Sequence, residues 1–458
     1  MKKLLLLVFV SIFFLIPNYQ SDLNNIPNSG DEIQYWEIGY GIFSSGEYKR
    51  ETINSSIDEN SKLELGYRRG EPIYPLLIAG IIRINNLFNE VSIENCSSID
   101  CSVFDEEVAL LVLLAHLFKS IIILMVYTTL KSRYSYSVSA ALTLTLLLML
   151  PVEYKDLITV LLLTLGIHFY YKKRLLGLLF LSLLPLSNAV FIYILPAVFI
   201  TYFLLKKNNV KNSIITLLIL LIPSMMWMGR NYSTVNQFSI TGRASEVLSI
   251  RAEYSTNSFD QIRAGYIFYT PARPFIFGAI QGKFWSYVTD SRSDVVYNRS
   301  NSQSSYRMAK ELNGVVGSKL KSKNFESRSY IEQQQILNTV SINLIRENFP
   351  QHLLLSTVFG YRGMFPAINF DFIDFYSFPE SISLLIKEIF SFLRLFFIPY
   401  GLVKSIINLL SKKPSLCSLL LIVLWGFFAT LTHFIPRYAT YLLIPAVHLV
   451  ANIDKEEV

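Results

Sequence analysis

Long runs of apolar residues constrain this chain more than any other feature of its sequence. Val108–Leu130, Ala189–Leu205, Ser213–Met228 and Leu416–Phe434 each approach or reach the roughly 17 to 25 residues that a helix needs to cross the hydrocarbon core of a membrane. Because lipid offers no hydrogen-bond partners to the backbone, such runs must form helices. The sequence therefore predicts an all-α polytopic membrane protein and excludes a soluble globular domain.

The net charge of +7 is explained by where the basic residues lie. They gather at the chain start and in short connections between apolar runs, and none of these connections contains an acidic residue. This is the positive-inside pattern, which marks the connections as cytoplasmic. We therefore expect no nucleic-acid partner. The residues concerned are Lys2, Lys3, Lys131, Arg133, Lys172, Lys173, Arg174, Lys206, Lys207, Lys211, Lys412 and Lys413.

Alternation across the membrane then predicts about ten transmembrane helices and two large outer regions. Residues 1–17 form the first helix, read as an uncleaved anchor rather than a cleaved signal peptide. Residues 18–105 form the first outer region, 106–228 contain helices two to seven, and 229–380 form the second outer region. Residues 381–458 contain the last three helices and a short cytoplasmic tail. The chemistry is therefore expected on the extracytoplasmic face of the cell membrane.

Two stretches need a decision within this topology. Residues 175–205 could be one tilted helix, but two short helices broken at Pro185–Asn188 keep Lys206 and Lys207 on the cytoplasmic side. We therefore predict two helices there. Residues 382–410 are predicted to cross as one span. The other predicted spans cover about 106–130, 137–151, 157–171, 213–228, 416–434 and 438–451.

The cysteines and histidines give no sign of a metal centre. Cys96 and Cys101 share the first outer region, where a disulfide or two thiols are both compatible with the sequence. Cys417 lies in a predicted span and is expected to pack there. The five histidines are scattered without paired-ligand spacing. We expect no cofactor, while a divalent ion stays open.

The first outer region carries two groups of residues with chemical potential. Asp31 and Glu32 follow the first span directly, and in such a pair one carboxylate can act as a general base while the other orients it. The alternative is solvated surface charge. Further along, Arg68 and Arg69 offer bidentate forks suited to a phosphate. They could instead balance nearby carboxylates or contact lipid headgroups.

Two more arginines stand at the outer ends of predicted helices. Arg230 lies in the segment Trp227–Tyr232 at the end of the seventh span, and Arg437 lies in the segment Pro436–Pro445 at the start of the last one. Arginines at such positions commonly reach toward headgroups. Taken singly, both are explained as interfacial anchors.

Taken in order, these motifs resemble one family. An acidic pair after the first span, the Tyr74-Pro75 motif, the Trp-x-x-Arg-Asn segment and a final Arg-Tyr pair followed by a proline are similar to the GT-C superfamily of polyprenyl-phosphate-dependent glycosyltransferases. The chain looks most like the lipid A aminoarabinose transferases and the protein O-mannosyltransferases. The segment Ile345–Pro350 resembles the juxtamembrane helix that precedes the C-terminal spans of such enzymes. Between the motifs, the resemblance rests on topology.

The resemblance implies roles for individual residues. Asp31 would match the family's catalytic acidic residue, with Glu32 as its neighbour, and Arg68 or Arg69 would bind the carrier phosphate. The family has its basic residue directly before the proline, where this chain has Glu71, so the choice between the two arginines stays open. The remaining implied substrate-binding residues are Tyr35, Tyr74, Arg230, Arg437 and Tyr438.

The implied reaction transfers a sugar from a polyprenyl-phosphate donor to a lipid, glycan or protein acceptor. Asp31 would take the proton of the acceptor hydroxyl, and arginines would stabilise the departing phosphate. Direct displacement predicts inversion at the anomeric carbon. Two other classes remain open: an O-antigen-type polymerase or ligase, and a transporter or flippase. Against a transporter, the predicted spans are nearly free of charge and the two halves of the chain do not match.

Overall fold

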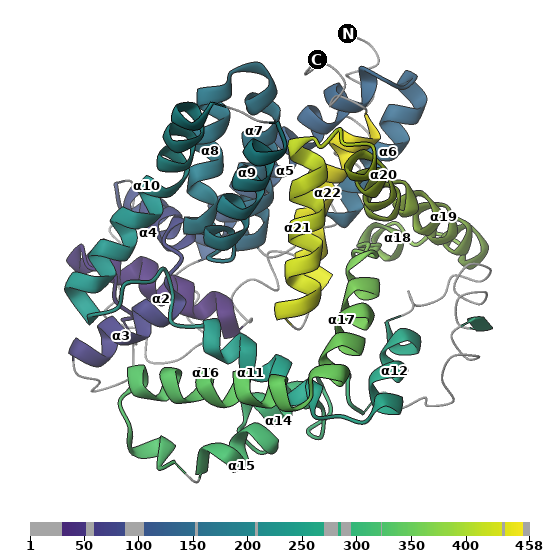
Figure 1. Ribbon diagram of the computed structural model, residues 1–458. Helices are drawn as coiled ribbons and strands as arrows, with labels where there is room; N and C mark the ends of the chain where they lie inside the picture. Colours follow the sequence, from purple (N-terminus) through teal and green to yellow (C-terminus); the bar gives the residue numbers. More distant parts are fainter. Residues whose placement is uncertain are drawn as a thin grey trace. The chain divides into compact units, whose positions relative to one another are not determined.

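The described part of the computed structural model is helical and contains no strand (Figure 1). It covers residues 30–51, 59–87, 105–151, 154–206, 209–269, 283–284, 295–321, 323–432 and 436–451. The first predicted span, at residues 1–17, lies outside these ranges, as do Cys96 and Cys101.

The helices of the first half confirm several predictions of the sequence. The runs predicted over 106–130, 137–151 and 157–171 form α5, α6 and α7, and the run predicted over 213–228 forms the longer α10. The bounds are α2 Gly30–Ser45, α3 Glu59–Arg69, α4 Ile73–Asn86, α5 Asp105–Lys131, α6 Tyr136–Met149, α7 Tyr154–Lys172, α8 Arg174–Ser187, α9 Phe191–Lys206 and α10 Val210–Val235.

The second half begins with short helices and ends with apolar ones. Its last two helices, α21 and α22, correspond to the spans predicted over 416–434 and 438–451. The bounds are α11 Ala244–Ser255, α12 Phe259–Phe268, α14 Ser305–Lys310, α15 Val315–Lys321, η4 Phe325–Ser327, α16 Tyr330–Glu347, α17 Phe349–Gly363, α18 Asp371–Phe375, α19 Glu380–Leu393, η5 Arg394–Phe396, α20 Ile398–Leu410, α21 Leu416–Leu431 and α22 Pro436–Val450.

The chain divides into two compact units. The first unit contains residues 1–241, 369–378 and 451–458, and the second contains residues 242–368 and 379–450. The second unit therefore joins most of the predicted second outer region to the helices α19–α22.

In the first unit, some helices pack against their neighbours in the chain and others against more distant helices. α7 and α8 pack together and are joined through Lys173 alone (Figure 1). Gly177 allows this approach, because a Cβ at that position would lie 2.2 Å from the backbone nitrogen of Tyr170. The helix α10 packs on α8 and α9, and α2 packs on α4. The polar residues described below lie near the ends of some of these helices.

The stretch 175–205 forms two helices, as predicted. α8 ends at Ser187 and α9 begins at Phe191. Between them, the side chain of Asn188 accepts a hydrogen bond from the backbone of Val190 at 3.2 Å. Asparagine competes for backbone hydrogen bonds in this way and so favours helix ends.

The stretch 382–410 differs from its prediction. Instead of one helix, the structure has α19, the short turn η5 and α20, with a break at Phe397, whose φ and ψ are −102° and −96°. The physical reason is Pro399, which stands in the first turn of α20. Proline cannot continue a helix from the preceding turn because its ring collides with the carbonyl four residues earlier.

The second unit has a core of its own around α11, α15 and α16. Buried apolar side chains from these three helices meet there: Ala252, Val316, Leu320, Leu337, Val340 and Leu344. α16 begins with a capping box in which Ser329 and Glu332 satisfy each other's backbone N–H groups. α17 packs along α21, and α20, α21 and α22 pack together. Cys417 is buried in α21, as expected for a packing residue.

Two of the described helices are long and apolar enough to cross a membrane. They are Glu107–Lys131, with 25 residues, and Val210–Val235, with 26. Further apolar helices of 10 to 17 residues are shorter than a full span: Ile73–Asn86, Tyr136–Met149, Arg174–Ser187, Phe191–Lys206, Leu416–Leu431 and Tyr438–Val450.

Candidate functional site

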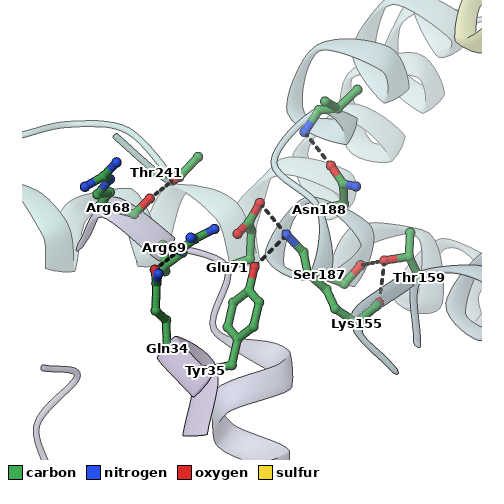
Figure 2. Close-up of polar contacts among 12 residues, drawn as sticks. Gln34, Tyr35, Arg68, Arg69, Glu71, Lys155, Thr159, Ser187, Asn188 and Thr241 are labelled. Atoms are coloured by element: carbon green, nitrogen blue, oxygen red, sulfur yellow. Dashed lines mark hydrogen bonds and ion pairs between the residues drawn. The ribbon is translucent and has the colours of Figure 1, made fainter. Parts of the chain in front are cut away.

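The first unit gathers polar side chains from four helices at the loop between α3 and α4. We call Gln34, Tyr35, Arg69, Glu71, Tyr74 and Lys155 the Glu71 cluster, of which Figure 2 labels all but Tyr74. Its centre is the ammonium group of Lys155, which lies 3.0 Å from Oε1 of Glu71. The same group donates a hydrogen bond of 3.0 Å to the hydroxyl of Tyr35. One lysine from α7 therefore ties the loop to α2.

The ring of Tyr35 in α2 contacts the two cations, Lys155 and Arg69, and the ring of Tyr74 in α4. Lys155 Nζ lies 5.4 Å from the centre of its ring, and the guanidinium carbon of Arg69 lies 6.0 Å from it. Tyr74 meets the ring edge to face at 5.3 Å. Arg69 also donates a hydrogen bond to the side chain of Gln34, one residue before Tyr35. These contacts fix the start of α2 relative to both cations.

Glu71 is a buried carboxylate with spare capacity for hydrogen bonding. The residue is only 6% exposed, and Lys155 occupies Oε1. Among the described atoms, Oε2 is buried and has no hydrogen-bond partner. Among its named members, the Glu71 cluster contains this one carboxylate and two cations, Arg69 and Lys155. The cluster therefore has a net positive charge and is suited to an anionic ligand.

The loop that carries Glu71 is held by residues at the end of α10. The carbonyl of Gly70 accepts a hydrogen bond of 2.8 Å from the indole of Trp227, and the carbonyl of Arg68 accepts one of 2.8 Å from the hydroxyl of Thr241. A Cβ on residue 70 would lie 2.1 Å from the backbone oxygen of Ile240. Only glycine fits at this crossing.

Arg230 joins this support from α10. Its guanidinium lies 5.5 Å from the ring centre of Tyr48 and 5.2 Å from that of Trp227. It also donates a hydrogen bond of 3.1 Å to Asn231. Tyr48 in turn donates a hydrogen bond of 3.4 Å to the backbone oxygen of Glu71. Burial, followed by the nearby Glu71 carboxylate, raises the pKa of Tyr48 well above its usual value, so the hydroxyl remains a donor.

The structure brings together Tyr35, Arg69 and Tyr74 from the predicted site, and links Arg230 to them through Tyr48 and Trp227. Arg68 contributes its backbone carbonyl to the loop support. The roles predicted for these residues stay predictions.

Asp31 and Glu32 lie in the first turn of α2, and their side chains fall outside the described residues. Four residues make about one helical turn, so position 31 lies next to position 35 along the helix. Arg437 is the second residue of α22 in the second unit, and its side chain is also outside the described residues. Tyr438 stacks on Phe428 at 4.7 Å within that unit.

Sequence reasoning missed Lys155 and the partnership of Glu71. Lys155 is 120 residues from Tyr35 in the chain. It stands between the predicted spans 137–151 and 157–171, where a single lysine matches no functional motif. Glu71 appeared only as a departure from the pattern of the resembled family. The available signal was the position of Lys155 itself, a cation at the outer end of an apolar run.

The second unit contains a different polar cluster around Arg251, which is fully buried. Its guanidinium donates hydrogen bonds to His352 Nδ1 at 3.3 Å, to the His352 carbonyl at 3.2 Å, to the Ser356 hydroxyl at 2.6 Å and to the Thr432 carbonyl at 3.1 Å. It also lies 5.0 Å from the ring centre of Phe359. One side chain therefore connects α11 to α17 and to the end of α21.

Burial shifts both titrating members of this Arg251 cluster. Burial lowers the pKa of Arg251 to about 9. Burial, together with the positive charge of Arg251, lowers the pKa of His352 to about 4. At neutral pH, Arg251 is charged and His352 is neutral, so the imidazole can accept the hydrogen bond through Nδ1.

Within the described ranges, no group of three or more His, Cys, Asp or Glu side chains could hold a metal ion. The described residues define an all-helical protein with two helices able to cross a membrane and a polar cluster at helix ends. No protein-family model, no curated protein and no solved structure significantly matches this chain.

Proposed function

We propose that this chain is a multi-pass membrane glycosyltransferase, which transfers a sugar from a polyprenyl-phosphate carrier to an acceptor outside the cytoplasm. One observation carries the proposal: α2 begins with the acidic pair Asp31 and Glu32 and, one turn later, presents Tyr35 to the cation Lys155. A general base and cations near a leaving phosphate are the two elements that such a transfer needs.

The distribution of polar residues on α10 supports the membrane location. Its exposed positions include Ile214, Leu218, Ile222 and Met226, which are 53%, 54%, 51% and 72% exposed, while Ser224 is fully buried. A helix on the surface of a soluble protein shows the reverse pattern, with its apolar face inward. Lipid is the solvent that favours an apolar exterior. This argument supports a lipid environment for α10, and the further crossings and the outer position of the Glu71 cluster are part of the proposal.

In the proposed reaction, Asp31 accepts the proton of the acceptor hydroxyl while that oxygen forms a bond to the anomeric carbon. The bond from this carbon to the carrier phosphate breaks, and the phosphate leaves with the electron pair and a negative charge. Arg69 and Lys155 stabilise that charge. Glu32 orients Asp31. No covalent intermediate forms, so the configuration at the anomeric carbon inverts.

This proposal gives Glu71 and Lys155 a joint role. The resembled family has a basic residue directly before the proline, whereas here Glu71 stands before Pro72. Glu71 binds Lys155 of α7 at 3.0 Å, so a cation reaches this part of the loop from another helix. Arg230 also belongs to the proposed substrate-binding residues, and the family resemblance implies the same role for Arg437 and Tyr438 of the second unit. The acceptor is a lipid, a glycan or a protein.

Replacement of the proposed base tests the function directly. A deletion strain is complemented with the wild-type gene, with Asp31→Asn, or with Asp260→Asn, whose carboxylate is 77% exposed on α12 and serves as the matched control. Mass spectrometry of envelope lipids, surface proteins and glycans follows the sugar-modified product. We expect Asp31→Asn to lower its amount by about 100-fold or more, at equal protein levels in the membrane, and Asp260→Asn to leave it unchanged.

Other outcomes would point to the alternative classes. Full product with Asp31→Asn eliminates the proposed mechanism. Loss of long glycan chains from the deletion strain, without loss of a single-sugar modification, would indicate a polymerase or ligase. Sugar-lipid flux through liposomes without glycosidic transfer would indicate a transporter.

A further inference from the structure

The helix α19 carries a continuous apolar stripe on its exposed face. Five large side chains, spaced three and four residues apart, are each between 43% and 61% exposed. Spacings of three and four place residues on one face of a helix. The fifth residue of the row, Phe396, is the last residue of η5. The five residues are Ile382, Leu385, Ile389, Phe392 and Phe396.

The opposite face of α19 is polar and buried. Ser383 and Ser391 are 8% and 4% exposed, and Arg394, directly after the helix, is 6% exposed. The guanidinium of Arg394 lies 5.5 Å from the ring centre of Phe365. The polar side of α19 therefore faces protein while its apolar side faces outward. This order is unfavourable in water, because the whole stripe would remain hydrated.

The length of α19 argues against a full crossing. Its 14 residues extend about 21 Å, whereas the hydrocarbon core is about 30 Å thick. The break at Phe397 ends the helix. Lys387 and Glu388 stand near its middle, both partly exposed. Charges at the centre of a bilayer are costly, whereas a helix that lies along the interface places such groups at headgroup level.

The exposed residues of the next helix, α20, indicate what covers the apolar stripe of α19. α20 packs against α21 and α22, and its outward residues Tyr400, Val403 and Ile407 are 44%, 57% and 55% exposed. Its polar residue Asn408 points the other way and donates a hydrogen bond of 2.9 Å to Ser418 in α21. The apolar surface of α19 thus continues onto α20, which belongs to an apolar helix bundle. One solvent, lipid, accounts for both surfaces.

We propose that α19 lies in the plane of the membrane interface, with its apolar stripe against the acyl chains, and that the chain turns into the bilayer at the Arg394–Phe397 break to continue as α20. The occupant of the stripe is a lipid bilayer. The inference rests on the membrane location within the proposed function, but it does not depend on sugar transfer.

Depth measurements with spin labels test the geometry. A nitroxide is attached through a genetically encoded ketone amino acid at residues 382, 385, 389, 392 and 396 of the full-length protein, so that all native cysteines remain. The protein is placed in phosphatidylcholine–phosphatidylglycerol nanodiscs. Power saturation with oxygen and with a water-soluble nickel complex gives the depth of each label. Residues 214, 218, 222 and 226 of α10 form the matched control.

For α19 we expect all five labels at similar shallow depth, within about 5 Å of one another, because an in-plane helix has no depth gradient. For α10 we expect a steady gradient of about 18 Å over its four labels. A gradient of about 20 Å along α19 would show a crossing helix and overturn the proposal. Low oxygen contact with spin–spin broadening would show that a second copy covers the stripe, and would also overturn it.

The control separates this inference from the proposed function. If the α10 labels have no lipid contact, the membrane location fails, and the proposed function fails with it. If α10 shows its gradient and α19 shows one too, only the orientation of α19 is wrong. If both expectations hold while Asp31→Asn stays fully active, the membrane geometry stands and the transferase mechanism falls.

Discussion

The two polar clusters of this protein differ in the groups that compensate a buried positive charge. In the first unit, Lys155 is paired with the carboxylate of Glu71 and keeps partial contact with solvent, since its side chain is 15% exposed. In the second unit, Arg251 is fully buried, and its acceptors are two carbonyls, a hydroxyl and a neutral imidazole. The first arrangement balances charge with charge, whereas the second balances charge with dipoles.

This difference bears on which cluster could meet a ligand. An anionic ligand can reach Lys155, because this cation keeps partial contact with solvent. The acceptors of Arg251 belong to two separate segments of the chain, α17 and the end of α21, and the buried guanidinium has no contact with solvent. The Arg251 cluster therefore holds helices in place, while the Glu71 cluster is the proposed binding site.

Removal of Arg251 is expected to have the largest effect on stability. Arg251→Met leaves the acceptors from His352, Ser356 and Thr432 buried and without their donor, which costs about 4 kcal/mol in the free energy of unfolding. Equilibrium unfolding in mixed micelles measures the loss. Arg263→Met is the matched control, because Arg263 is 40% exposed and paired with an exposed Asp260. Equal stability of the two variants would contradict the structural role of Arg251.

Removal of Lys155 should have a smaller effect that a second substitution reverses. Lys155→Met leaves the Glu71 carboxylate buried without its ionic partner, at a cost of about 2 kcal/mol. Glu71→Gln removes the charge that needed a partner, so the double variant should be more stable than Lys155→Met alone. A double-mutant cycle gives the interaction energy directly. Additive effects would show that the pair does not interact.

The pH dependence of stability gives the smallest expected effect. The pKa of His352 in the folded protein is about 4, below the value of about 6.5 for an unfolded histidine. The unfolded chain therefore binds a proton first as the pH falls, and stability is lost between pH 6.5 and pH 4. We expect this residue to contribute about 1 kcal/mol of loss between pH 6 and pH 5. His352→Asn should flatten that slope, and an unchanged slope would contradict the assignment.

The sequence predicted helices well where apolar runs were bounded by basic or turn-forming residues. The break near Asn188 was predicted because the positions of Lys206 and Lys207 required it. The break at Phe397 was not, because the run 382–410 reads as one apolar segment and Pro399 alone did not prevent that interpretation. The apolar pattern over the whole segment predicted one helix, whereas Pro399 breaks the helix only in the turn that precedes it.

The candidate site was predictable only in part, for a similar reason. Tyr35, Arg69 and Tyr74 lie within about 40 positions of one another, and a motif order could group them. Lys155 and Arg251 reach their partners through tertiary packing, across 120 and 181 residues of chain respectively. Such pairings leave no local pattern in a single sequence.

The crossing at Gly70 has a consequence for biosynthesis. Trp227 and Thr241, whose side chains hold the loop around Gly70, are translated 157 and 173 residues after the groups they bind. At about 5 to 20 residues per second, the ribosome needs roughly 10 to 30 s to supply them. During that interval the α3–α4 loop is already made but lacks its support. The α3–α4 loop is thus synthesised early, but its supporting hydrogen bonds can form only after Trp227 and Thr241 have been translated.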